Sequence, residues 1–185
     1  MSDSTAPRLF VAGEDADTVR RLVEAMAVAD DGPAVTIDTW SPGTRLPEGV
    51  IAGAILADAA EAASDAIRAH GDACLWVLPS DEAAVLDAGR TAARVLWFGI
   101  DPTQPDLLER MRRGGDAGYW EDGTLFLQRD EDLEALISEA TLPMARGGED
   151  RRATALALAA AALASCAGIG CDAMRDALGA FEVPA

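Results

Sequence analysis

The sequence contains no lysine and only one histidine, and all 15 of its cationic side chains are arginine. The absence of lysine excludes every mechanism that needs a side-chain amine, including Schiff-base chemistry, a phosphate-loop lysine and a carbamylated-lysine metal site. His70 precedes Gly-Asp after a helical stretch, which favours a helix-end role. The chain has three cysteines, Cys74, Cys166 and Cys171, and no C-x-x-C pair. This odd number without a paired motif indicates neither a disulfide framework nor a zinc site. We expect a reduced, cytoplasmic protein without a metal.

Acidic side chains outnumber basic ones by 32 to 15, which gives a formal net charge of −17. A field of this sign repels nucleic acid and anionic membranes, so neither is an expected partner. The longest apolar stretch, residues 155–170, is mostly alanine and falls short of the roughly 20 residues that a spanning helix needs. It predicts a buried helix that ends near Gly168.

The order of apolar segments predicts an α/β domain, with a mostly parallel sheet flanked by helices and one β-hairpin. We expect a disordered tail at 1–7 and a single domain at 8–185. Periodicity does not decide whether residues 50–56 form a strand or the start of a helix. Strands are predicted at 8–13, 34–37, 73–78 and 93–99, a hairpin at 117–128, and helices from Thr18, up to Gly71, from Ser80 or Asp81 to Gly89, before Gly114, and at 150–166 and 171–181. Residues 130–144 predict a short amphipathic segment and then an edge strand limited by Pro143.

The stretch "VAGEDADTVRRLVEAM", residues 11–26, has the form of a phosphate-binding loop. A predicted strand reaches Gly13, and Thr18 opens a helix whose apolar residues recur at helical spacing. Backbone N–H groups cradle phosphates where a strand, a tight loop and a helix follow one another in this way. The loop nevertheless carries Glu14, Asp15 and Asp17, which a phosphate would meet as like charges.

Residues from about 69 to 183 resemble the central domain of Mur-type ligases, and most closely the Mur-ligase portion of cyanophycin synthetases. The likeness rests on the order and spacing of "ACLWVLPSDE", "ARVLWFGID", "AGYWEDGTLFL", "LPMARGGED", the alanine-rich helix and "MRDALGAF". The resemblance implies an α/β domain related to ATP-dependent amide ligases.

The resemblance also gives the loop a template, because the family's phosphate loop reads V-x-G-T-N-G-K-T. Gly13 and Thr18 match it, whereas Ala16 replaces the second glycine and Asp17 replaces the lysine. At an effective dielectric constant of about 20, two like charges about 4 Å apart repel by roughly 4 kcal/mol. Several such contacts exceed the roughly 8 kcal/mol of a micromolar nucleotide site. We therefore expect no ATP binding and no cofactor.

Other family features are missing as well. Pro79 and Leu156 stand where the family has asparagines, although Asp81 remains. The region that carries the family's magnesium-binding glutamate and carbamylated lysine is shortened to residues 44–65, and the family's C-terminal domain has no counterpart in the 185 residues. The resemblance thus implies a degenerate, truncated and catalytically inactive domain.

Three hypotheses for the function follow. The first is an inactive accessory or protein-binding module of a peptide- or polyamide-ligase system, which binds a protein partner or a second copy. Trp40, in a predicted loop, is the candidate contact residue, while Trp76 and Trp97 are expected to fill the core.

The second hypothesis is a small-molecule or anion binder that uses the residual cleft at the carboxyl ends of the strands. Asp81, Arg146, Arg151 and Arg152 are its candidate residues, unless the arginines pair with neighbouring acids. The third is an enzyme of unrelated chemistry, for which only acidic pairs such as Asp130/Asp132 are available.

Overall fold

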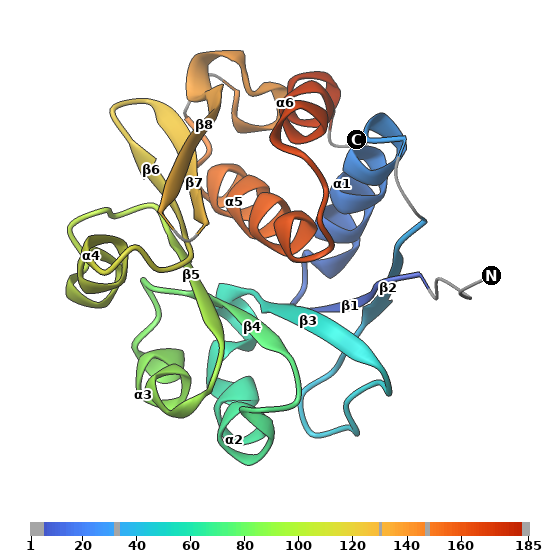
Figure 1. Cartoon of the computed structure of the whole chain (residues 1–185), viewed down its shortest axis with the longest axis vertical. Helices are drawn as coiled ribbons and strands as arrows, with labels where there is room; N and C mark the ends of the chain where they lie inside the picture. Colours follow the sequence, from blue (N-terminus) through green and yellow to red (C-terminus); the bar gives the residue numbers. More distant parts are fainter. Residues whose placement is uncertain (1–5, 32–33, 130, 147–148, 183–185) are drawn as a thin grey trace.

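The computed structural model describes residues 6–31, 34–129, 131–146 and 149–182. Their strands form one eight-stranded sheet in the order β2-β1-β3-β4-β5-β6-β7-β8 (Figure 1). Strands β1 to β6 run parallel to one another. Strand β7 pairs antiparallel with β6, and β8 pairs antiparallel with β7. The α/β architecture with a mostly parallel sheet and a hairpin is confirmed. The strands are β1 (Arg8–Ala12), β2 (Thr36–Thr39), β3 (Val50–Ile55), β4 (Leu75–Pro79), β5 (Val95–Gly99), β6 (Ala117–Glu121), β7 (Thr124–Arg129) and β8 (Asp132–Ser138).

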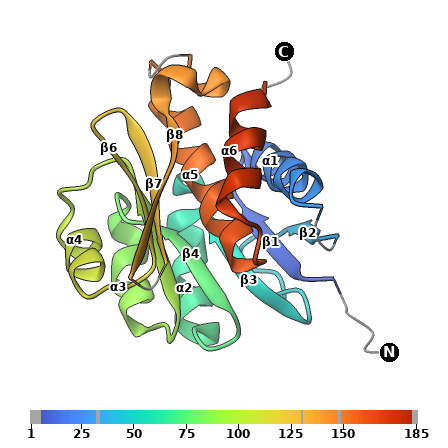
Figure 2. The ribbon, with the colours of Figure 1, turned by 45° about the horizontal axis from the view of Figure 1, so that its top comes forward.

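Helices cover both faces of this sheet, as Figure 1 and Figure 2 show from two directions. Helices α1, α5 and α6 pack together on one face, and α2, α3 and α4 lie on the other. Two separate apolar cores result, one on each side of the sheet. The helices are α1 (Ala16–Ala29), α2 (Ala60–His70), α3 (Ala83–Thr91), α4 (Pro105–Arg112), α5 (Arg151–Cys166) and α6 (Cys171–Ala180), with short 3-10 helices at Ala57–Ala59, Glu139–Thr141 and Pro143–Ala145.

Strands β4 and β5 are buried along their whole length, as continuous apolar runs predict for central parallel strands. Alternate side chains enter opposite cores, so Trp76 and Trp97 face α2 and α3 while Val77 and Leu96 face α5. Both tryptophans fill the core, as expected. No helix in the described part of the chain is long and apolar enough to cross a membrane.

Trp40 is not a surface contact residue, and this expectation was wrong. It is only 5% exposed, and its ring packs edge-on against Phe10 with centroids 5.5 Å apart. Its backbone N–H donates to the carbonyl of Val11, which ties the start of the 40–49 loop to β1. A loop residue is thus buried because the loop folds back over the sheet.

The structure decides one region that the sequence left open and corrects the prediction for another. Residues 50–55 form strand β3, which settles the choice that periodicity left open. The predicted edge strand before Pro143 is wrong, because the edge strand is β8, at Asp132–Ser138. Pro143 instead begins a 3-10 helix, where its missing N–H leaves no hydrogen bond unmade. Residues 1–5 of the expected tail lie outside the described residues.

Helix α3 also differs at both ends from its prediction. It begins at Ala83, after Glu82, and neither Ser80 nor Asp81 caps it. Gly89 does not close it but lies inside it, facing the sheet. A Cβ on Gly89 would lie 2.5 Å from Cη2 of Trp97 and 2.8 Å from Cδ1 of Leu78. This glycine is therefore required by close packing and not by the helix end.

We predict that Gly89→Ala destabilises the fold, because the added Cβ would overlap the side chains of Trp97 and Leu78, which would have to shift. The overpacking cost of about 1–3 kcal/mol exceeds the roughly 1 kcal/mol that alanine gains from helix propensity. Gly179→Ala in α6 is the matched control, since its Cβ would make an ordinary van der Waals contact, 3.9 Å from Cδ1 of Ile137. Urea denaturation should show a lower midpoint for the first variant and an equal or higher one for the second. Equal midpoints for both variants would contradict the packing argument.

Candidate functional site

The loop between β1 and α1 lies at the carboxyl edge of the parallel strands. Gly13 has φ +136°, a conformation that favours glycine, and a Cβ there would lie 2.6 Å from Cβ of Leu56. Helix α1 begins at Ala16, two residues before the predicted start, and Asp15 occupies its N-cap position without a side-chain cap. The expected strand, tight loop and helix are thus present.

The backbone of this loop already holds a carboxylate. The Glu14 N–H donates to Oδ2 of Asp58 at 2.6 Å, from the 3-10 helix that follows β3. Loop N–H groups before a helix N-terminus attract anions. Asp58 supplies that negative charge from within the chain, in the place where such loops take up an external anion.

Other donors of the loop are also engaged within it. The Ala16 N–H donates to the Gly13 carbonyl at 3.2 Å. The N–H groups of Thr18 and Val19 both donate to the Asp15 carbonyl, at 3.0 and 3.2 Å. The loop therefore closes on itself.

Asp15 makes an ion pair across the sheet edge with α5. Its Oδ2 lies 2.5 Å from Nε of Arg152, and Oε2 of Glu14 lies 3.7 Å from Nη2 of the same arginine. The hydrogen bond that Arg152 donates to Asp15 is the largest cause that raises the pKa of the Arg152 guanidinium. Because these groups are solvent-exposed, the pair contributes little stability, but it engages the Arg152 guanidinium with two acids of the loop.

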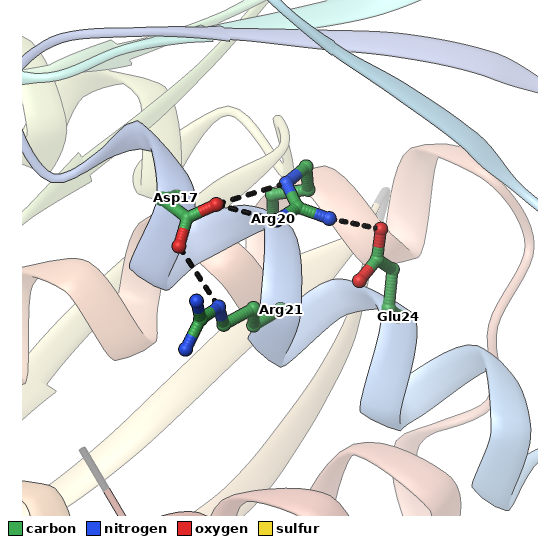
Figure 3. A network of polar contacts seen from close by, with 4 residues as sticks. All are labelled: Asp17, Arg20, Arg21 and Glu24. Atoms are coloured by element: carbon green, nitrogen blue, oxygen red, sulfur yellow. Dashed lines mark hydrogen bonds and ion pairs between the residues drawn. The ribbon is translucent and has the colours of Figure 1, made fainter. Parts of the chain in front are cut away.

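Asp17, the third acid of the 14–17 stretch, turns along α1 (Figure 3). It pairs with Arg20 and, at 2.8 Å, with Arg21, while Arg20 also reaches Glu24 at 2.7 Å. The Arg20 hydrogen bond is the main reason that the pKa of Asp17 is lowered. The acidic side chain is thus satisfied on the helix surface.

Two cavities flank the Asp15–Arg152 pair. The first, about 350 Å³, opens at the ends of β3, β4 and β5. The second, about 420 Å³, lies between α1 and the start of α5. Both are lined by Asp15, Arg152 and Leu156, so the ion pair stands between them.

The structure brings three of the four candidate cleft residues to the first cavity. Asp81, Arg151 and Arg152 line it, whereas Arg146 lines the second cavity. Arg152 pairs with acids, as the competing expectation proposed. Arg151 and Arg146 have no ion pair within the described ranges. Arg146 has φ +48°, at the end of a 3-10 helix.

Asp81 lies just beyond β4 and is held by the neighbouring strand. Its Oδ2 accepts a hydrogen bond from the Ile100 N–H at 3.0 Å. Burial raises the pKa of Asp81, and this hydrogen bond opposes the shift only in part. The nearby Asp101 has the opposite behaviour, because hydrogen bonds from Thr103 lower its pKa.

Asp58 is the site residue that sequence reasoning missed. It comes three residues after the end of β3, and the ends of neighbouring parallel strands meet at one edge. Assigning residues 50–55 to a strand beside β1 would have placed Asp58 next to the loop. Among the residues that the structure describes, no group of three or more histidine, cysteine, aspartate or glutamate side chains could hold a metal ion.

Comparison with known proteins supports the fold alone. No family model and no curated protein matches the sequence. Among solved structures, the chain is similar to a pseudomurein peptide ligase type C from Methanothermus fervidus, with a TM-score of 0.59 and 13% sequence identity. The alignment covers 100% of this chain and 51% of that one, so this chain spans about half its length. The fold is therefore Mur-ligase-like, while the likeness to cyanophycin synthetases in particular stays a prediction.

We predict that Asp81 titrates above the usual aspartate range and Asp101 below it. Burial disfavours the charged form of Asp81, and the Thr103 hydrogen bonds favour the charged form of Asp101. Carboxyl-detected NMR over a pH series measures both values in one sample. On lowering the pH, Asp81 should take up its proton first. The reverse order would contradict this description of the cavity.

We predict that Asp58→Ala exposes the Glu14 amide. Removal of a carboxylate acceptor at the surface costs on the order of 1 kcal/mol, so hydrogen exchange of this amide should accelerate about threefold to tenfold. The amides of Thr18 and Val19 should keep their rates, because their acceptors remain. Asp65→Ala, which removes an exposed charge on α2, is the control. An unchanged Glu14 rate would show that Asp58 does not hold the loop.

Proposed function

We propose that this chain is a catalytically inactive Mur-ligase-like domain that binds a protein, as an accessory module of a peptide- or polyamide-ligase system. The single observation that carries the proposal is the hydrogen bond between the Glu14 N–H and Asp58. It means that the loop is already filled by a carboxylate of the same chain. A nucleotide would have to displace Asp58 and tolerate Glu14 and Asp15 beside its own negative charges.

The charges around the loop support this proposal. Asp17 replaces the positive charge that such loops use, and Arg152 is engaged by Asp15. No lysine exists elsewhere in the chain to compensate. A domain that does not bind ATP can still bind a protein through its surface. Because a similar fold occurs in a peptide ligase, we propose an enzyme of that kind as the partner. Within this proposal, the cyanophycin-synthetase-like motifs favour a polyamide ligase, acting in the cytoplasm.

Calorimetric titration with ATP, with and without Mg²⁺, tests the proposal. We expect no saturable heat up to millimolar ATP. A variant with the family's loop, Glu14→Thr, Asp15→Asn, Ala16→Gly and Asp17→Lys, combined with Asp58→Ala, provides the comparison. If charge and the internal carboxylate are what exclude ATP, this variant gains measurable affinity. Micromolar binding by the native protein would overturn the proposal.

The accessory role needs a separate experiment. The tagged chain, isolated from its own cells, should retain an amide ligase through a wash at moderate salt. The same chain should show no ATP-dependent ligation by itself. Recovery without any ligase, together with ligation activity of the purified chain, would contradict the proposed role.

A further inference from the structure

We infer that the cavity at the ends of β3, β4 and β5 binds a lysine or arginine side chain of a partner protein. The inference rests on the proposed function as a protein-binding module and names the site and the chemistry of the contact. Three features of the cavity carry it, namely its size, its apolar wall and its charge.

The cavity is small and mostly apolar. Its volume of about 350 Å³ lies at the lower end of the range for ligand pockets, roughly 300–1,000 Å³, and is large enough to admit one long side chain. Its apolar wall is made by side chains from three strand ends and from α5. These include Leu56, Pro79, Phe98, Ile100 and Leu156.

The charged groups around this wall are mainly acidic. Five carboxylates line the cavity against two arginines, and the acidic residues are Glu14, Asp15, Asp58, Asp81 and Glu82. Internal contacts already engage Arg152 with both Asp15 and Glu14, and they engage Asp58 with the Glu14 N–H. The cavity thus keeps Asp81 and Glu82 against Arg151. An incoming cation is attracted by this balance and an incoming anion is repelled.

Asp81 is the group that such a cation would meet. The Ile100 N–H fixes one carboxylate oxygen, and a carboxylate accepts about four hydrogen bonds in all, so capacity remains for an ammonium or guanidinium group. Burial disfavours the charged form of Asp81, and the attraction of Arg151 offsets this cost only in part, so a further cation beside Asp81 relieves more of it.

A basic side chain matches both halves of the cavity. Lysine and arginine lay an apolar stem along apolar surface and keep the charged end at a polar rim. The stem would contact Phe98 and Leu156, and the charged end would reach Asp81. A second copy of this chain is a poor source, because two chains of charge −17 repel each other.

Matched amino-acid amides test the inference. Lysine, arginine, norleucine and glutamate, each as the N-acetyl N′-methylamide, are titrated into the full chain at low salt and followed by amide NMR shifts. Lysine and arginine should shift residues 56–58, 79–82 and 98–100 in a saturable way. Norleucine has the same stem without the charge and should produce no saturable shift at the same concentrations. Asp81→Asn keeps an acceptor for the Ile100 N–H and should weaken lysine binding about tenfold.

The control is Asp87→Asn, which removes an exposed charge of α3 outside the cavity and should change lysine binding by less than about twofold. Tighter binding of the glutamate derivative, no binding of lysine, or equal effects of the two variants would each overturn the inference. ATP is titrated into the same sample. If lysine fails to bind and ATP also fails, only this inference falls, whereas saturable ATP binding would overturn the proposed function itself.

Discussion

The amide groups between β1 and the start of α1 need a negative partner, and the chain provides one through Asp58. This contact joins the loop to the segment that follows β3. Gly13 allows the loop to approach the β3 end closely, and the Glu14 N–H reaches Asp58 at 2.6 Å. Arg152, which lies 137 residues away in sequence on α5, then pairs with Asp15 across the cleft. Glu14 and Asp15, which are unsuitable for phosphate binding, thus make ion pairs that hold Arg152 over the loop.

Closure of the loop also determines what the rest of the cleft can do. Because the Asp15–Arg152 pair stands between two cavities, the cleft is divided into small compartments. The compartment at Asp81 keeps an apolar wall and an excess of carboxylates, a combination that suits a cationic side chain better than a polyanion. The same charges that argue against a nucleotide therefore argue for a basic protein contact.

Much of the fold could be predicted from sequence, because continuous apolar runs such as 73–78 and 93–99 have few alternatives to buried parallel strands. The stripe of Val19, Leu22, Val23 and Met26 likewise specifies α1 and is fully buried. Trp40 could not be placed, since its burial depends on how a loop folds over the distant Phe10. The role of Gly89 depends on the ring of Trp97. Asp58 was missed for a related reason, because its partner lies 44 residues away and the intervening strand was undecided.

The most direct test of a self-closed loop is a crystal structure of the protein grown at high concentrations of sulfate or phosphate. Such ions enter loops before a helix N-terminus when the backbone donors are free. The account predicts that the Glu14 N–H still donates to Asp58 and that the loop contains no anion. A sulfate or phosphate bound to the N–H groups of residues 14–18, with Asp58 displaced, would show that the loop remains a phosphate site and would contradict the account.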